Sequence, residues 1–584
     1  RTSPKYVNLA RGLSESQKEI VEGWGFPGII LEAEFARRYN YGRTLSHVLG
    51  HVDAYGEGIA GLEVKYNDVL HGVDGRRAVK RDRRGQIKSY VGGSVVEPRD
   101  GETLVLTIDL IRQTIVEEEL EKGIIESGAN WGTAIAMNPY SGAVLAMANY
   151  PTYDPNVPGR FPTAARRNHA ITDRIEPGST FKLVAAAAAL ERGLVSLDDT
   201  IDTGNGFRMF GRRPLHDTHG YGRISFEEVI AYSSNIGVGE SVRDLKPGDL
   251  YQYARNLGFG QPTWIDLPGE VSGSLKKPRD WSGTSKTSIS IGYEVDVTPL
   301  QMLTAYCALA NGGLLVRPYV VKERRNYKGE TTWTARQDSI RRAFKKKTAR
   351  KLIHSFERVV DEGTGTRAAI AGVRVAGKTG TARKAVDGGY SRKARATFVG
   401  FFPVDDPQVA LIVVLDEPSS SIYGGQTAAP IFQRIGERWI STFPDLAKQR
   451  AVTLAGTTDD ADVLQLPSVP NVSGQPAAVA ATGLLANGFH VDVPDIVGAT
   501  RRVLEQRPKA GRNADHGSFI RLAVATSTDT VRATPDVRGL SVRQATFWLA
   551  REGANVTVEG HGRVMSQTPR PGEPLTKNTI LKCQ

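Results

Sequence analysis

Residues 171–195 read ITDRIEPGSTFKLVAAAAALERGLV and join an extended segment to an alanine-rich helix. Pro177 and Gly178 interrupt the extended chain, and the residues after them have high helix propensity, so we expect Ser179 in the first turn of the helix. A hydroxyl there lies beside free backbone N–H groups, which can stabilise an oxyanion. Lys182 follows one turn later, on the same face. Burial against the alanines would lower the pKa of Lys182 and leave a neutral amine able to accept the serine proton.

The S-x-x-K pattern is weak evidence by itself, because a chain rich in serine and lysine contains it by chance. The alternative interpretation is a capping serine followed by a solvated lysine. The run from Ala185 to Ala189 favours a helix buried on all sides, where a lysine needs a functional reason. Two later segments supply such a reason.

The first of these segments, AYSSNIGVGE, contains the S-x-N pattern Ser233-Ser234-Asn235. The hydroxyl of Ser233 could relay a proton to a leaving amine, and the carboxamide of Asn235 could hold a substrate carbonyl. Taken alone, the segment is equally typical of a polar loop or a helix cap.

The second segment, VRVAGKTGTARKA, is predicted to be a strand. Lys378 and the hydroxyls of Thr379 and Thr381 would form a carboxylate-binding edge. Gly377 and Gly380 leave the backbone bare, so that an extended substrate can pair with the strand. The glycine spacing does not fit a phosphate-binding loop. The three motifs occur in the order S-x-x-K, S-x-N, K-T-G within one predicted α/β domain, and together they are strong evidence.

Changes in composition and hydrophobic patterning along the sequence divide the chain into domains. Residues 1–100 are polar and basic and predict an α+β accessory region of short strands and loops. Residues 101–445 predict a large α/β domain that contains a hairpin near residues 133–151, strands near 397–416 and a closing helix near 428–443. Residues 446–465 have the small, polar composition of a linker.

The last 120 residues or so contain an internal repeat, with proposed boundaries at 466–528 and 529–584. Six positions keep their order in both copies, namely Pro470/Pro535, Gly474/Gly539, Gly488/Gly553, Gln506/Gln567, Pro508/Pro569 and Gly511/Gly572. Each copy predicts a turn, an amphipathic helix, a strand, a Q-x-P-x-x-G turn and a final strand. Two tandem modules therefore close the chain.

The composition excludes several classes of protein. A formal net charge of +12 suits an acidic partner, but no nucleic-acid-binding pattern accompanies it, so we expect no nucleic acid. Only two cysteines occur, so neither a disulfide framework nor a metal cluster is predicted, and no cofactor is expected. No apolar run is long enough to span a bilayer. The chain starts at Arg1 without a methionine, and we expect that a natural start is missing.

The ordered motifs resemble those of the active-serine penicillin-recognising enzymes. The segments EPGSTFK, SIGYEVDVTPLQMLTAYCALANGG, EGTGTRAAIAGVRVAGKTGTA and IYGGQTAAPIF resemble class B penicillin-binding proteins, which are monofunctional transpeptidases. GIAGLEVKYNDVLHG, with Gly58, Gly61 and Glu63, resembles the pedestal (dimerisation-type) domain of that family. The terminal repeats resemble PASTA modules, and with Glu176 they favour the division-associated type.

The resemblance implies a fold and a set of residue roles. It implies a five-stranded antiparallel sheet with flanking helices and an all-helical lobe that carries the S-x-N motif. Carried over by motif, Ser179 is the nucleophile and Lys182 the base, while Ser233 and Asn235 relay a proton and clamp the substrate. Lys378 is a further catalytic residue by the same resemblance. The substrate carboxylate would be bound at Thr379, Gly380 and Thr381, and the backbone N–H groups of Ser179 and Thr381 would form the oxyanion hole.

The resemblance also implies a biological setting. The donor would be a D-Ala-D-Ala stem peptide of peptidoglycan, and β-lactams would acylate the same serine. A membrane glycosyltransferase of the shape, elongation, division and sporulation class would be a partner. The protein would work on the outer side of the bacterial inner membrane, anchored by an N-terminal transmembrane helix absent from this sequence.

The sequence departs from the pattern of this family in two places, and two alternative functions remain open. No R-G-x-I-x-D-R-x-G segment precedes Lys5, and Leu183-Val184 follows Lys182 where the family often has proline. No glycosyltransferase segment is present. A D,D-carboxypeptidase or a β-lactamase shares the three motifs, but no deacylating E-x-x-x-N motif follows Asn235. A wall-binding sensor without catalysis is the other alternative, although all motif residues are intact.

Overall fold

The computed structural model describes residues 7–32, 34, 36–81, 87–90, 96–337, 339–386, 389–446, 469–487, 489–492, 502–512, 519–524, 534, 536–542, 545–546, 549, 554–571, 573 and 578–583. The chain divides into two units, Arg1–Thr457 and Thr458–Gln584. The first unit holds two large hydrophobic clusters, and the second holds one smaller cluster in each of its two modules.

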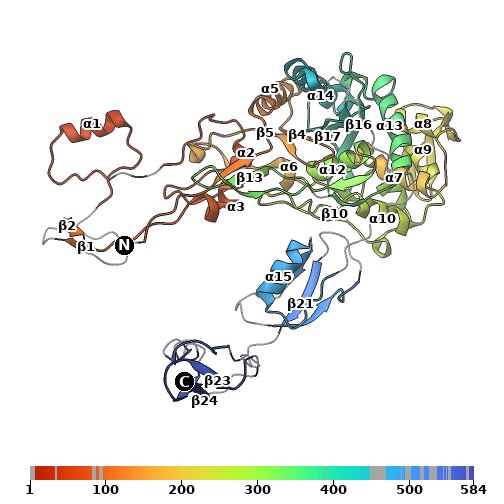
Figure 1. The fold of residues 1–584 in the computed structure, drawn as a ribbon. Helices are drawn as coiled ribbons and strands as arrows, with labels where there is room; N and C mark the ends of the chain where they lie inside the picture. The colour runs from red at the N-terminus through yellow and green to blue at the C-terminus, as the bar shows by residue number, and fades with distance from the viewer. Residues whose placement is uncertain are drawn as a thin grey trace. The chain divides into compact units, whose positions relative to one another are not determined.

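A five-stranded antiparallel sheet forms the middle of the first unit (Figure 1). Its strands, in spatial order, are β16 (Ala376–Val386), β17 (Gly389–Phe402), β18 (Val409–Asp416), β4 (Trp131–Met137) and β5 (Val144–Tyr150). Every residue of β18 is buried, because both faces of the sheet are covered. The predicted sheet, its hairpin and its late strands are confirmed.

Helices cover the two faces of this sheet (Figure 1). On one face, α5 (Leu110–Ser127) and α14 (Gly424–Thr442) pack against each other and against the strands. On the other face lies α12 (Pro299–Ala310), an apolar helix whose residues are all buried. Among the strands that the structure describes, β16 is at the edge of the sheet and pairs with β17 alone, so one side of its backbone is open. That edge carries the K-T-G motif.

The lobe that carries the S-x-N motif contains several helices and also strands. Its elements are α7 (Lys182–Glu191), β6 (Thr200–Gly204), β7 (Phe207–Phe210), β8 (Arg213–His216), β9 (Gly222–Ser225), α8 (Phe226–Ala231), α9 (Asn235–Ser241), α10 (Pro247–Asn256), α11 (Ser285–Ser290) and α13 (Lys346–Asp361). The expectation of an all-helical lobe is therefore wrong, because β6 pairs with β9 and β7 pairs with β8. Gly204, Gly206 and Gly211 have positive φ in this segment, which favours hairpins over a helix.

The N-terminal region consists of short elements joined by loops. They are α1 (Glu15–Gly23), α2 (Ser46–Leu49), α3 (Gly61–Lys65), α4 (Asn67–Leu70) and the pair β1 (Val79–Arg81) and β2 (Ile87–Tyr90). The following strand, β3 (Thr103–Leu106), pairs with β13 (Val321–Arg325), which also pairs with β14 (Thr331–Thr334). Segments more than two hundred residues apart in sequence therefore meet in one small sheet.

Short elements complete the first unit. They are α6 (His169–Thr172), β10 (Ser274–Leu275), β11 (Val295–Asp296), β12 (Leu314–Val316), β15 (Ser339–Arg342) and the 3-10 turns η1 (Pro158–Arg160), η2 (Thr163–Arg166), η3 (Gly178–Phe181), η4 (Pro278–Asp280), η5 (Thr366–Ala368) and η6 (Pro444–Leu446). The turn η3 matters most for function, because it contains Ser179.

The two C-terminal modules have the same strand pattern. The first contains α15 (Ala477–Ala486), β19 (His490–Asp492), β20 (Val503–Arg507) and β21 (Phe519–Val524), and the second contains β22 (Asn555–Glu559), β23 (Val564–Thr568) and β24 (Asn578–Cys583). In each, the last strand lies in the middle, parallel to the first strand and antiparallel to the second. Gln506 and Gln567 lie on strands rather than in the predicted turns, and their side chains accept from Val472 N and Val537 N, respectively.

Two further predictions concern segments between and around these domains. The predicted linker, residues 446–465, lies outside the described residues except for Leu446. Within the described ranges, none of the helices combines the length and the hydropathy needed to cross a bilayer.

Candidate active site

Ser179 lies in the short 3-10 turn η3, immediately before α7. The α-helix itself begins at Lys182, slightly later than predicted, because Gly178–Phe181 form a 3-10 turn in which Gly178 has a positive φ of 55°. The turn is held from both sides: Gly178 N donates to Gly292 O at 3.1 Å, and the Thr180 hydroxyl donates to Pro177 O at 2.8 Å. Ser179 is partly exposed between buried neighbours. The nucleophile candidate is therefore presented on a rigid, tightly bonded turn.

Lys182 is fully buried at the start of α7. Its Nζ donates to Ser233 O at 2.5 Å and to Ser233 Oγ at 3.2 Å, which joins the S-x-x-K and S-x-N motifs directly. Burial lowers the pKa of Lys182 to about 7, although the Asp217 carboxylate acts in the opposite direction. A large fraction of the Lys182 amine is therefore neutral near pH 7 and able to accept a proton.

The S-x-N turn is organised by a residue that the sequence argument missed, Asp217. Its carboxylate accepts from Ser234 Oγ at 2.5 Å, from Asn235 N at 2.5 Å and from Ile236 N at 3.2 Å. Ser234 in turn caps α9 by accepting from Gly237 N at 2.8 Å. The only available signal in the sequence was a lone acidic residue in RRPLHDTHG, which is too common to single out.

The other two residues of this motif differ in their surroundings. Ser233 has a positive φ of 61°, a strained conformation for a residue with a side chain, and it brings both its oxygens to Lys182. The Asn235 side chain donates to His216 O at 2.8 Å, so its amide nitrogen is fixed to the last residue of β8. Asn235 is partly exposed, which leaves its carbonyl oxygen available to a ligand.

Lys378 is the second buried amine of the site. It lies on β16 opposite Val399 of β17 and is fully buried. Burial lowers the pKa of Lys378 well below its usual range, and the nearby charge of Lys182 lowers it further. Two amines so close together cannot both be charged at low cost in a dry environment. The K-T-G motif is thus brought to the S-x-x-K motif, as the sequence predicts.

Close backbone contact joins β16 to the nucleophile turn. A Cβ added to Gly380 would lie 2.9 Å from Thr180 Cγ2 and 3.1 Å from Pro177 O. A Cβ added to Gly178 would lie 3.0 Å from Thr381 O. The glycine of K-T-G therefore permits the strand to pack against the turn, a role that the sequence argument did not give it.

The two threonines of this motif are already engaged in the free protein. Thr379 Oγ1 lies 2.7 Å from Thr364 Oγ1, and Thr381 Oγ1 accepts from Gly424 N at 3.3 Å. Gly424 begins α14, so the positive end of a long helix lies next to Thr381. This arrangement suits an anionic group of a ligand.

Glu176, three residues before Ser179, connects the nucleophile turn to the β16–β17 hairpin. Its Oε1 accepts from Glu294 N at 3.0 Å and from the Tyr390 hydroxyl at 3.1 Å, whereas its Oε2 is buried without a hydrogen-bond partner among the described residues. Burial raises the pKa of Glu176, and the nearby Asp296 raises it further, against the effects of these two donors and of Arg395. The sequence showed this residue only as part of the E-P-G-S context.

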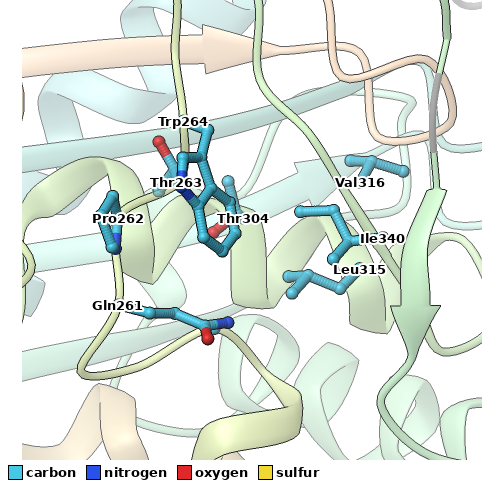
Figure 2. A pocket seen from close by; sticks show the side chains of 9 residues that line it. Gln261, Pro262, Thr263, Trp264, Thr304, Leu315, Val316 and Ile340 are labelled. Carbon is cyan, nitrogen blue, oxygen red and sulfur yellow. The ribbon is translucent and has the colours of Figure 1, made fainter. Parts of the chain in front are cut away.

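A small, largely apolar cavity lies elsewhere, among Gln261, Pro262, Thr263, Trp264, Thr304, Leu315, Val316 and Ile340 (Figure 2). Its lining includes none of the motif residues. The chemistry therefore belongs to the partly exposed surface beside Ser179 and the edge of β16, where three sequence motifs converge.

Comparison with protein families gives three matches. The penicillin binding protein transpeptidase domain matches residues 132–437, the penicillin-binding protein dimerisation domain matches residues 1–106, and the PASTA domain matches residues 533–582. The first match contains the three motifs described above.

Individual relatives agree with these matches. The chain is 35% identical over 434 residues to a probable peptidoglycan D,D-transpeptidase PenA from Neisseria meningitidis, covering 74% of this chain and 72% of that protein. It is 32% identical over 434 residues to the peptidoglycan D,D-transpeptidase FtsI of Escherichia coli, covering 74% of this chain and 71% of that protein. The crystal structure of penicillin binding protein 3 from Mycobacterium tuberculosis in complex with aztreonam is 31% identical, with a TM-score of 0.62 over 70% of this chain and 90% of that chain.

Proposed function

This chain belongs to the class B penicillin-binding proteins and is a peptidoglycan D,D-transpeptidase, and from that premise we propose that Ser179 carries the acyl group during the reaction. Lys182 follows Ser179 by about one helical turn. The contact of its buried amine with Ser233 is the observation that supports this assignment best. A buried lysine with a pKa of about 7 suits a general base.

In the proposed acylation step, Ser179 Oγ attacks the carbonyl carbon between the two D-alanines of the donor stem. Its proton passes to Lys182 Nζ as the C–O bond forms. The C–N bond then breaks, and the terminal D-Ala leaves as an amine that receives the proton through the Ser233 hydroxyl. The product is an ester on Ser179.

In the proposed second step, an amine of a neighbouring stem attacks this ester. The amine loses a proton to the basic site, a new amide bond forms and Ser179 regains its hydroxyl hydrogen. Backbone N–H groups of Ser179 and Thr381 stabilise the oxyanion in both steps. Asn235 and Lys378 hold the donor, and Thr379, Gly380 and Thr381 bind its carboxylate beside the start of α14.

The acceptor is proposed to be an amine rather than water. A hydrolase needs a carboxylate free to activate a water molecule. Of the two carboxylates described beside the motifs, Asp217 accepts three hydrogen bonds, and Glu176 accepts two through Oε1 while its Oε2 is buried away from solvent. This favours the transpeptidase over the carboxypeptidase and β-lactamase alternatives.

A product analysis tests this proposal. Uncross-linked glycan strands with pentapeptide stems are incubated with the wild type and with Ser179→Ala, and the muropeptides are quantified. We expect cross-linked dimers to exceed tetrapeptide monomers with the wild type, and neither product with Ser179→Ala. Tetrapeptide monomers without dimers would identify a carboxypeptidase instead.

The setting of the enzyme is proposed from its substrate. Peptidoglycan lies outside the cytoplasmic membrane, so we propose that the transpeptidase domain works there. Cross-linking consumes glycan strands that a glycosyltransferase must supply, and a membrane enzyme of the shape, elongation, division and sporulation class would fit. We also propose that β-lactams acylate Ser179, since a relative was crystallised with aztreonam.

Residues 533–582 match a PASTA domain, and we propose residues 466–528 as a second module of the same kind. The proposal rests on repeated contacts: Arg502 donates to Gly474 O at 2.6 Å, and Arg563 donates to Gly539 O at 2.8 Å. The glutamine bonds of Gln506 and Gln567 are repeated as well.

A further inference from the structure

The proposed mechanism leaves the strong positive charge of the chain unexplained. Residues 336–351, RQDSIRRAFKKKTARK, contain eight basic residues and one acidic residue, whereas the whole chain has a formal net charge of +12. This segment alone therefore carries a formal net charge of +7, from eight basic residues and one acidic residue. This segment leads into α13 and forms its first turns.

Five of these cations form what we call the basic face of α13: Lys345, Lys346, Lys347, Arg350 and Lys351. All five are exposed, and no carboxylate among the described residues lies within salt-bridge distance of any of them. Near the other end of the same helix the positive charge of Arg358 is balanced, because this residue pairs with Glu227 and Glu362. The basic face is thus a local excess of charge.

This placement works against the stability of the helix. The first turn of a helix carries the positive end of its dipole, so cations there are unfavourable. Lys346 and Arg350, and likewise Lys347 and Lys351, are like charges four residues apart, which repel each other. A charge pattern that opposes the local fold is typical of a binding surface.

The basic face lies away from Ser179. Glu191, the last residue of α7, accepts hydrogen bonds from Lys345 N and the Thr348 hydroxyl. Lys182 is at the opposite end of α7, about 13 Å away along the helix axis. A partner bound to the basic face would therefore leave the nucleophile free to react.

We propose that the basic face of α13 binds the peptidoglycan strand through the carboxylates of stem peptides that are not in the active site. This inference rests on the proposed function, because the donor stems of that reaction end in carboxylates and repeat along a polymer. Carboxylates repeated in this way complement clustered lysines. Within the described residues of α13, no large apolar side chain is exposed, so the helix itself lacks the apolar groups that enter a lipid bilayer.

Two matched variants test this proposal. The first, Lys346→Gln/Lys347→Gln/Lys351→Gln, removes three charges from the basic face, and the second, Lys65→Gln/Lys122→Gln/Lys328→Gln, removes three exposed charges that are far apart in sequence. Binding to soluble, uncross-linked glycan strands with pentapeptide stems is measured in a Ser179→Ala background, which prevents turnover. We expect about a tenfold loss of affinity for the first variant and less than about twofold for the second, and the difference should disappear in high salt.

Two controls separate this idea from a structural effect and from the proposed function. With Ser179 present, both triple variants should be acylated by penicillin at the wild-type rate, and the first should melt at or above the wild-type temperature. Equal strand affinity of the two variants, or no binding by the parent, would overturn the proposal. If the first variant lost affinity only for anionic phospholipid vesicles or only for inorganic polyphosphate, the partner of the basic face would be that anion and not the peptidoglycan strand. Failure of the wild type to react with penicillin would instead contradict the proposed function.

Discussion

Lys182 occupies a position that costs the fold free energy. A charged amine is expensive to bury, and the structure lowers this cost by lowering the pKa of Lys182 to about 7. The sequence predicted this shift from the alanine run around α7, because a lysine in a helix buried on all sides is exceptional. The sequence could not predict that Ser233 O lies 2.5 Å from the amine, since this depends on the positive φ of Ser233.

The pH dependence of acylation tests the role of Lys182. If Lys182 is the base, acylation by penicillin requires its neutral form, so the second-order rate constant should rise with pH and level off above about pH 8. The midpoint should lie near the lowered pKa of about 7 and belongs to the coupled pair of Lys182 and Lys378. Stopped-flow or gel-based labelling between about pH 5 and 9 measures this profile. A flat profile would exclude Lys182 as the base.

Replacing Lys182 tests its role as the base directly. Lys182→Arg keeps a cation but removes the ability to accept a proton near neutral pH, because the guanidinium stays charged. We expect the acylation rate to fall by about a thousandfold. The thermal transition must remain cooperative for the comparison to hold, and near-normal acylation by this variant would contradict the assignment.

At the scale of elements, the site depends on three segments that meet: the turn η3, the start of α9 and the edge strand β16. The order of the motifs predicted that they belong to one domain, and the apolar runs predicted the sheet. The sequence could not predict the contacts that align these segments, because each contact involves a single residue without a distinctive motif around it. Asp217 and Thr364 are examples, and the hairpins between residues 200 and 225 are another.

Asp217 holds the S-x-N turn through its charge, and removing that charge tests this role. Asp217→Asn retains the size of the side chain but loses the charge that accepts from Ser234, Asn235 and Ile236. We expect a loss of about 2 kcal/mol in the free energy of unfolding and a fall in acylation of about tenfold to a hundredfold, because the S-x-N turn shifts. Calorimetry and penicillin labelling measure the two effects.

The exposed Asp198→Asn is the matched control for this change, and it should alter neither quantity. If Asp217→Asn behaves like Asp198→Asn, the turn is held by other contacts and the account of α9 is wrong.

At the scale of the whole molecule, the chain consists of parts with their own cores. The two large clusters draw on residues between Val48 and Leu446, and each C-terminal module has a separate small cluster. The repeat in the sequence predicted the tandem modules, since matched glycines and prolines mark equivalent turns. It did not predict the strand that carries the repeated glutamine of each module, Gln506 or Gln567, because that strand is short and polar.

Separate cores lead to a prediction about truncation. A chain that ends after Leu446 should retain penicillin acylation at the wild-type rate and the main thermal transition of the longer protein, because no residue of the two large clusters is removed. Calorimetry and labelling of the two forms side by side provide the measurement. Loss of the main transition on truncation would show that the C-terminal modules stabilise the catalytic unit.

Mass spectrometry of the protein after reaction with benzylpenicillin tests directly whether Ser179 is the nucleophile. Our account predicts one adduct per chain, located by peptide mapping on Ser179, with a lifetime of hours and no adduct in Ser179→Ala. An adduct on another residue would contradict the assignment of the nucleophile, and release of the adduct within minutes would indicate a hydrolase.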